Sequence, residues 1–207
     1  GEFRHGAGRG CSSLIMIALG TGVGGGVIVD KKLMLGAHCG AGEIGHTMLD
    51  PQGPLCTCGS LGCIEAYAGS VGVLKEARRR AQSPACPADF REFVTKHGDG
   101  LTTRHLTALA DQGDPTALAI FAWSGKALGQ TIGNLINIFD PEKVIIGGGV
   151  ARAGDHILRP VRETYPGMVL CRESARIPTV PAELGSLAAA IGSATLAREA
   201  AAGNCRA

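Results

Sequence analysis

Aromatic side chains, net charge and long apolar runs are all scarce in this chain, and each scarcity argues against a class of function. Aromatic residues make up 4% of the 207 residues, too few for the stacking platforms that bind single-stranded nucleic acids. The formal net charge of +2 does not predict a nucleic-acid or anionic-membrane partner. The longest clean apolar run, residues 14–19, is too short to cross a bilayer, and the first residues do not resemble a signal peptide.

What remains is the composition of an ordinary globular protein. Hydrophobic residues make up 45% and charged residues 18%, and the length suits one substantial core. Without internal repeats or low-complexity linkers, the chain is expected to form one α/β unit. Eight cysteines at scattered spacings predict a reducing, cytoplasmic location rather than a disulfide framework. Three of them, between residues 56 and 63, form a cluster. The other five are expected to be buried small hydrophobic residues or incidental thiols: Cys11, Cys39, Cys86, Cys171 and Cys205.

The most informative segment starts at His46 and reads HTMLDPQGPLCTCGSLGCIE. Together with His46 it contains Cys56, Cys58 and Cys63, and one imidazole with three thiolates is a ligand set of structural Zn²⁺ sites. Glycine and proline residues between the ligands allow the loop to fold back on itself. Two alternatives stay open, namely unrelated free thiols or a disulfide in a secreted protein. We expect a zinc loop over residues 46–63.

Two glycine-rich turns each follow a predicted strand. The first, residues 20–26, joins strands at 14–19 and 27–29 and contains the pattern Gly-x-Gly-x-x-Gly. In dinucleotide-binding folds a helix follows that pattern, whereas a strand follows it here. We interpret it as a hairpin whose backbone can approach a phosphate, with a plain glycine hairpin as the alternative. The second turn, 147–149, lies between a strand at 143–146 and a helix, an arrangement that suits a nucleotide.

Periodicity and turn signals predict the other elements. A dense mixture of proline, glycine and polar residues over 82–105 is interpreted as a variable surface excursion. The expected elements are a strand at 33–35, a helix over 70–81 with Ser70 as N-cap, a long amphipathic helix from Asp114-Pro115 to about Asn137, a helix over about 155–165, an edge strand at 177–180 and a helix over 185–200.

The combined motifs resemble the ROK family of sugar kinases and sugar-responsive repressors. The resemblance rests on ALGTGVGGGVIVDKKLMLGAHCGAGEIGH, on CTCGSLGCIEAYAG and on LGQTIGNLINIFDPEKVIIGGGVARAG, and it covers the chain from Gly1 to about Glu199. It implies an α/β fold, the ribonuclease-H-like lobe of the actin/hexokinase/Hsp70 ATPase fold with a zinc-binding loop. It also implies sugar and ATP with Mg²⁺ as ligands, a homodimer in the full-length protein, and no membrane partner.

The family motifs also imply roles for individual residues. His46 would use one ring nitrogen for zinc and offer the other to the sugar, since a metal fixes the tautomer and orientation of an imidazole. The implied assignments are Glu43, His46 and Glu65 to sugar hydroxyls; His46, Cys56, Cys58 and Cys63 to Zn²⁺; Gly20, Thr21 and Gly22 to the γ-phosphate side of ATP; and Gly148 and Gly149 to its adenosine side.

One departure from the family pattern limits the expected chemistry. The Asp-x-Gly-Gly-Thr phosphate loop and the Asn-Asp motif with the catalytic Asp do not occur in the 207 residues. Phosphoryl transfer requires a positioned base, Mg²⁺ and phosphate clamps. We therefore expect residues 1–207 to form the C-terminal, large lobe of a ROK sugar kinase, without its N-terminal lobe. No catalytic residue is assigned, and the isolated chain is expected to be inactive.

Three functions remain open at this point. The first is ATP-dependent phosphorylation of a hexose or N-acylhexosamine, as in glucokinases. The second is the effector domain of a sugar-sensing ROK transcriptional repressor, the one case in which nucleic acid would be a partner. The third is a zinc-stabilised sugar-binding module without chemistry. The intact glycine hairpin favours the kinase, because repressors of the family often degrade it, but the sequence does not name the sugar.

Overall fold

The computed structural model of the protein describes residues 1–201, and Cys205 lies outside the described residues. Its α-helices and strands, in chain order, are α1 (Glu2–His5), β1 (Leu14–Leu19), β2 (Val23–Val29), β3 (Lys32–Leu33), α2 (Glu65–Ala68), α3 (Ser70–Ala81), α4 (Ala88–His97), α5 (Thr103–Asp111), α6 (Pro115–Phe139), β4 (Lys143–Gly147), α7 (Asp155–Thr164), β5 (Thr179–Pro181) and α8 (Ala188–Ala201). Short 3₁₀ turns cover Ile44–His46, Gly98–Gly100, Val150–Ala153, Tyr165–Met168, Ser174–Arg176 and Gly185–Leu187.

The strands form one mixed sheet in the order β3-β2-β1-β4-β5. β1 runs antiparallel to β2 and parallel to β4, which is itself parallel to β5. Ile15 therefore lies opposite Val27 on one side and Val144 on the other. Because β1 and β4 are parallel neighbours, their carboxyl ends, each followed by a glycine turn, meet at one edge of the sheet.

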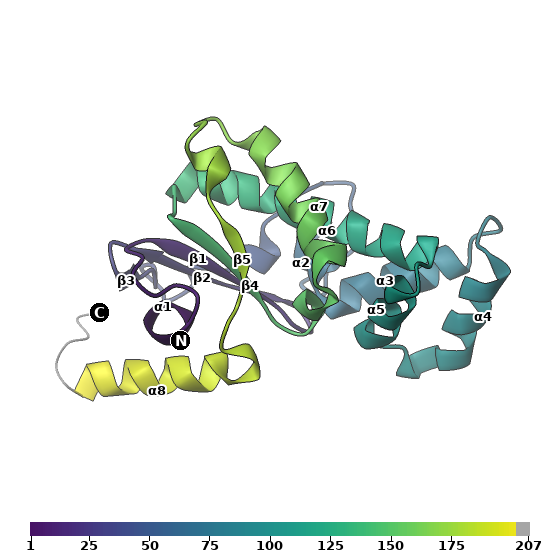
Figure 1. The fold of residues 1–207 in the computed structure, drawn as a ribbon, viewed down its shortest axis with the longest axis horizontal. Coiled ribbons are helices and arrows are strands. Elements are labelled where there is room, and N and C mark those ends of the chain that lie inside the picture. The colour runs from purple at the N-terminus through teal and green to yellow at the C-terminus, as the bar shows by residue number, and fades with distance from the viewer. Residues whose placement is uncertain (202–207) are drawn as a thin grey trace.

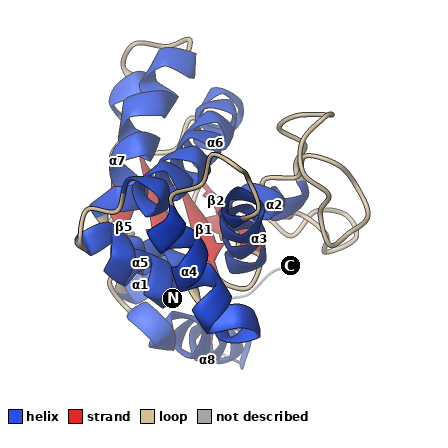
Figure 2. Cartoon of the chain, turned by 90° about the vertical axis from the view of Figure 1, so that its right-hand side faces the viewer, coloured by secondary structure: helices blue, strands red, loops and turns tan. Residues whose placement is uncertain are grey.

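Helices cover both faces of the sheet, with α6 and α7 on one face and α1 and α8 on the other (Figure 1). The side chains of β1 alternate accordingly. Ile15 and Ile17 enter the large core shared with α6, whereas Leu14 and Met16 belong to the smaller core beneath α1. Turned by 90°, the molecule shows its strands enclosed by helices, with long loops extending beside α2 (Figure 2).

The start of the long helix α6, at Asp114 and Pro115, was predicted correctly. The carboxylate of Asp114 accepts a hydrogen bond from the backbone N–H of Ala117 at 2.7 Å, and proline occupies the first turn. Against α7, α6 presents small residues. Gly125 lies so near the carbonyl oxygen of Ile157 that an added Cβ would be 2.5 Å from it. The two helix backbones therefore approach closely along this contact.

The interpretation of residues 82–105 as a surface excursion was wrong. Helix α4 lies within this region and α5 begins at its end, and Phe90 and Leu101 are buried in the large core. Pro87 and Gly98 had suggested a loop, but they flank α4 at its two ends. Proline and glycine at such positions delimit a helix rather than exclude it.

Three smaller expectations also change. Gly69, not Ser70, is the N-cap of α3, and Ser70 is already helical. Glycines 24–26 belong to strand β2, so the first glycine turn is shorter than expected. The last strand is β5, at 179–181 rather than 177–180, and a 3₁₀ turn precedes α8.

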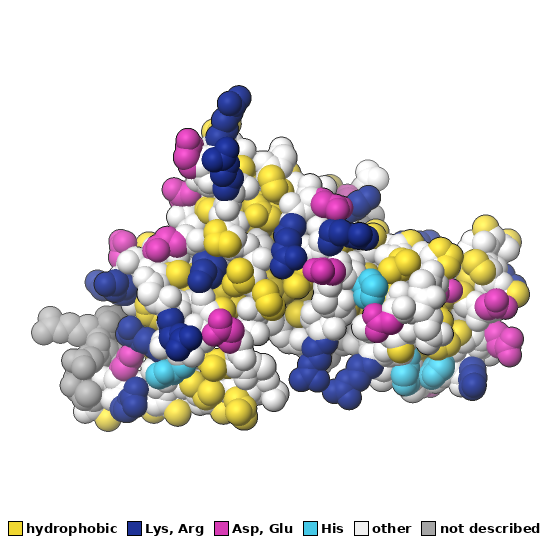
Figure 3. All heavy atoms as spheres, in the orientation of Figure 1, with side chains coloured by type: hydrophobic (Ala, Val, Ile, Leu, Met, Phe, Trp, Pro, Cys, Tyr) yellow, Lys and Arg dark blue, Asp and Glu magenta, His cyan; other side chains and the backbone are white. Residues whose placement is uncertain are grey.

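On the face seen in Figure 3, basic and acidic side chains are interspersed among hydrophobic ones, in keeping with the small net charge. Over residues 1–201, each helix is too short or too polar to span a membrane.

Candidate functional site

A compact loop brings the four predicted metal ligands together. His46 ends the 3₁₀ turn that starts at Ile44, Cys63 lies two residues before α2, and the chain between them folds back on itself. Isolated bridges pair Met48 with Cys63 and Leu55 with Leu61. These contacts between the two arms close the loop.

Two glycines allow the turns in this loop. Gly59 and Gly62 have φ angles of 91° and 70°, which favour glycine. A Cβ on Gly62 would also overlap the carbonyl oxygen of Asp50. The glycines noted in the sequence are therefore required by the shape of the loop.

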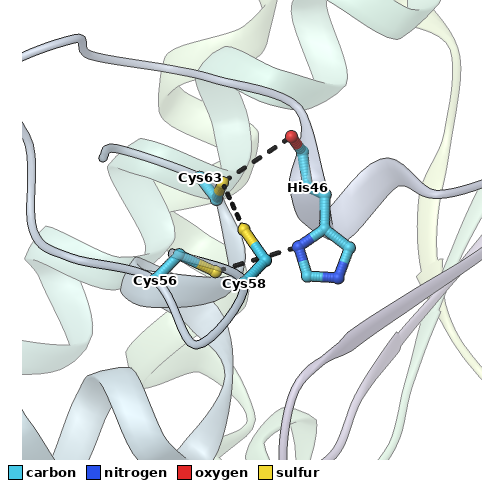
Figure 4. A group of neighbouring side chains, drawn as sticks. All are labelled: His46, Cys56, Cys58 and Cys63. Carbon is cyan, nitrogen blue, oxygen red and sulfur yellow. Dashed lines mark hydrogen bonds between the residues drawn. The ribbon is translucent and has the colours of Figure 1, made fainter. Parts of the chain in front are cut away.

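The spacing of the ligand atoms fits a tetrahedral zinc ion. The Sγ atoms of Cys58 and Cys63 are 3.7 Å apart, and Cys56 Sγ lies 3.8 Å from His46 Nδ1 (Figure 4). All four ligand atoms lie within 4.8 Å of one another. Zn–S bonds of about 2.3 Å at tetrahedral angles separate two sulfur ligands by about 3.8 Å. The donor set and its dimensions thus suit Zn²⁺.

The thiols of this cluster differ in acidity. Hydrogen bonding to Ser60 lowers the pKa of Cys58 to about 6. Burial, together with the neighbouring Cys58 and Cys56, raises the pKa of Cys63 to about 12. Thiolates are the metal-binding form, so a cation among these sulfurs would displace protons.

Glu65, the first residue of α2, connects the metal loop to the glycine hairpin. Its Oε1 accepts a hydrogen bond from the hydroxyl of Thr57 at 2.6 Å, and its Oε2 accepts one from the backbone N–H of Val23 at 3.2 Å. The Thr57 hydroxyl is the largest cause of a lowered pKa at Glu65. Gly22 leaves room for the carboxylate, because a Cβ there would overlap Oε2.

The other two sugar-site candidates lie on one turn. Glu43 is exposed and caps the 3₁₀ turn that ends at His46, and its carbonyl oxygen accepts a hydrogen bond from His46 N–H at 3.1 Å. His46 is also exposed and directs Nδ1 toward Cys56. Its Nε2 lies on the far side of the ring from the sulfurs (Figure 4).

The structure brings the two glycine turns next to each other. Gly148, with φ at 98°, packs so tightly against Leu19, the last residue of β1, that a Cβ would overlap its carbonyl oxygen. Gly20 follows Leu19 directly and accepts a hydrogen bond from Ser70 N–H at 2.9 Å. Thr21, the next residue, is exposed. The hairpin, the second glycine turn and the start of α3 therefore adjoin.

Sequence reasoning missed Thr57 as a partner of the site. The one signal was its position between two metal ligands, which does not by itself indicate where a hydroxyl points. The other cysteines meet the expectations only in part: Cys11 and Cys86 are partly buried against the cores, whereas Cys39 and Cys171 are exposed.

Known proteins share this architecture. The model of the ROK family matches residues 1–200. A glucokinase of Streptomyces coelicolor is 37% identical over 204 residues, which are 96% of this chain and 63% of that protein. A xylose repressor of Caldicellulosiruptor bescii is 32% identical over 73% of this chain and 37% of its own length.

Among solved structures, a ROK family glucokinase from Streptomyces griseus in complex with glucose and AMPPNP has a TM-score of 0.82 and 36% identity. The match covers 96% of this chain and 64% of that chain. The predicted fold, that of one lobe of the actin/hexokinase ATPase family, is confirmed by these likenesses. The chain spans less than two thirds of the length of these relatives.

Proposed function

Because the chain belongs to the ROK family, we propose that it forms the sugar site and part of the nucleotide site of an ATP-dependent kinase for a hexose or N-acylhexosamine. One observation carries this function: the carboxylate of Glu65 is held between the metal loop and the hairpin at Val23. A sugar-binding group and a phosphate-binding turn therefore lie side by side. Similarity to glucokinases supports the same activity.

The zinc ion would act as a structural cofactor. Cys56, Cys58, Cys63 and His46 Nδ1 would hold it, which fixes the loop and the plane of the imidazole. With Nδ1 on the metal, Nε2 would carry the proton and would donate a hydrogen bond to a sugar oxygen.

The two carboxylates complement this donor. Glu43 and Glu65 accept hydrogen bonds from sugar hydroxyls, and such bonds to a charged group are among the stronger ones. One donor and two acceptors on a rigid frame are suited to a polyol such as a hexose.

The glycine turns would bind the nucleotide. Gly20, Thr21 and Gly22 would approach the γ-phosphate of Mg²⁺-ATP, because a backbone without side chains lets its amides reach phosphate oxygens. Gly148 and Gly149 would lie on the adenosine side. The contact of Gly148 with Leu19 supports a single continuous nucleotide site across both turns.

In this proposal the described lobe binds and orients substrates, and the catalytic base comes from outside the 207 residues. The chain then corresponds to the C-terminal lobe of the kinase, and the full-length protein forms a homodimer. Turnover of glucose by the purified chain alone, free of other kinases, would contradict this assignment.

The similarity to a xylose repressor supports a second candidate, the sugar-sensing domain of a ROK repressor. Both candidates share the zinc loop and the sugar site, so nucleotide binding separates them. The open hairpin, with Thr21 and Gly24 exposed, favours the kinase.

Calorimetry on the zinc-loaded chain tests the function. We expect glucose or N-acetylglucosamine to bind, and Mg²⁺-AMPPNP to bind at a separate site. Glu43→Gln should weaken sugar binding, whereas Glu92→Gln on the exposed side of α4 serves as a matched control. Absence of sugar binding by a fully metallated chain would overturn the proposal, and sugar binding without nucleotide binding would favour the repressor.

A further inference from the structure

We infer that Thr57 is a positioning residue of the sugar site, whose hydroxyl orients the Glu65 carboxylate and links that orientation to the metal loop. This role rests on the proposed function, because it is the proposed function that makes Glu65 a sugar ligand. Thr57 is exposed and contributes no buried surface to the core. Its contribution is therefore the hydrogen bond rather than packing.

The carboxylate of Glu65 is held from two directions. Thr57 Oγ1 donates to Oε1 at 2.6 Å, and Val23 N–H donates to Oε2 at 3.2 Å. One donor belongs to the metal loop and the other to strand β2. Because each oxygen has its own donor from a different segment, rotation of the carboxylate would break at least one bond.

Thr57 is the donor from the loop that persists when the loop holds metal. Cys56 Sγ also lies near Oε1, at 3.6 Å. As a metal ligand, however, Cys56 is a thiolate and has no proton to donate. The hydroxyl of Thr57 is then the side-chain donor from the loop to Oε1.

The metal would in turn hold Thr57 in place. Thr57 lies between Cys56 and Cys58, both of which belong to the ligand cluster. With both neighbours fixed to one ion, the backbone of Thr57 has little freedom. One path from the ion to Glu65 thus runs through Thr57 and a single hydrogen bond.

This arrangement prepares Glu65 for a ligand. A carboxylate has about four acceptor positions, and the protein uses one on each oxygen. The remaining positions can accept sugar hydroxyls without a further change of rotamer. Ordering a side chain before binding lowers the entropic cost of the complex.

Two substitutions at this position separate the hydroxyl from the shape of the side chain. Thr57→Val keeps the shape and removes the donor, whereas Thr57→Ser keeps the donor. In the zinc-loaded chain we expect Thr57→Val to weaken glucose binding about 10-fold, since hydrogen bonds to charged groups are the stronger ones. Thr57→Ser should restore affinity to within about 3-fold of wild type. Thr95→Val, which removes an exposed hydroxyl bonded to Arg91 O on α4, is the matched control.

A second measurement does not depend on sugar. The backbone amide of Val23 donates to Glu65, so its ¹⁵N–¹H resonance reports the position of the carboxylate. We expect this resonance to move in Thr57→Val but not in Thr57→Ser or Thr95→Val. Zinc content is measured for each variant and should stay at one ion per chain.

Each outcome decides a specific point. Unchanged glucose affinity and an unmoved Val23 resonance in metallated Thr57→Val would overturn the positioning role while the proposed function stands. Loss of zinc from Thr57→Val would make Thr57 part of the loop structure instead, which also overturns the role. Absence of glucose binding by the metallated wild type would overturn the proposed function, and the role of Thr57 with it.

Discussion

The ring of Tyr67 lies against the indole of Trp123, with 4.9 Å between the centroids and 37° between the planes. Tyr67 belongs to α2 and Trp123 to α6. The hydroxyl of Tyr67 contacts the metal loop at Gly53, where an added Cβ would overlap it. Trp123 is the only tryptophan in the sequence, so the tryptophan fluorescence comes from this one residue. It reports on the metal loop through the contact with Tyr67.

Loss of one zinc ligand should therefore be visible in Trp123. We predict that Cys58→Ser loses the metal and unfolds the loop over residues 50–65, because structural zinc sites contribute directly to folding. Metal analysis and the tryptophan emission spectrum measure the two effects. Cys39→Ser, at an exposed cysteine outside the cluster, should change neither. A Cys58→Ser protein with stoichiometric zinc would refute the ligand assignment.

Zinc binding should release protons and strengthen as pH rises. At pH 7 the Cys63 thiol, with its pKa raised to about 12 by burial, is protonated and must lose its proton to the metal. Cys58, with its pKa lowered to about 6 by hydrogen bonding to Ser60, is already mostly thiolate. Each proton released gives about a tenfold gain in apparent affinity per pH unit.

Calorimetry in buffers of different ionisation enthalpy counts these protons. We expect Cys63 to contribute one proton at pH 7 and Cys58 to contribute little. An apparent zinc affinity that stays constant between pH 6 and pH 8 would contradict the assignment of protonated thiols.

Gly22→Ala should disturb the sugar site without unfolding the sheet. The new Cβ would overlap Oε2 of Glu65 and displace the carboxylate from Val23. We expect glucose affinity to fall about 10-fold or more, as for loss of a charged hydrogen bond. Gly26→Ala, in open space on the adjoining strand β2, is the control. Equal glucose affinities for the two variants would argue against a fixed Glu65.

Glu76 should stabilise the protein in a pH-dependent way. Burial by itself would raise the pKa of this carboxyl, but hydrogen bonds from Arg79 and Arg80, at 2.6 Å and 2.7 Å, outweigh it and lower the pKa. Because the folded pKa lies below the unfolded value of about 4.3, the stabilisation is fully present above that value. It is lost as pH falls through the folded pKa.

Glu76→Gln should therefore lower the free energy of unfolding by about 1–3 kcal/mol at pH 7. Urea denaturation at pH 7 and near pH 4 measures the effect, and the difference from wild type should shrink at the lower pH. Glu92→Gln, at an exposed glutamate, should have little effect at either pH. A difference that is the same at both pH values would exclude the ion pairs as its cause.

Much of the fold could be predicted because its signals are local. The apolar run at 14–19 and the Asp114-Pro115 cap appear as β1 and as the start of α6. Residues 82–105 could not be predicted in the same way, because the burial of Phe90 and Leu101 depends on the core that this segment meets. Proline and glycine signal a boundary, but they do not say what lies between boundaries.

The sequence by itself determined which groups are available: one imidazole and three thiols in a glycine-rich loop, two flanking carboxylates and two glycine turns. These follow from residue type and spacing. Only the tertiary structure decided that Thr57 reaches Glu65, that Glu65 reaches Val23, and that Gly148 adjoins Leu19. Such contacts depend on the pairing of β1 with β4 and on the closure of the loop onto α2, and a short hydrogen bond forms only once those packed elements fix both of its ends.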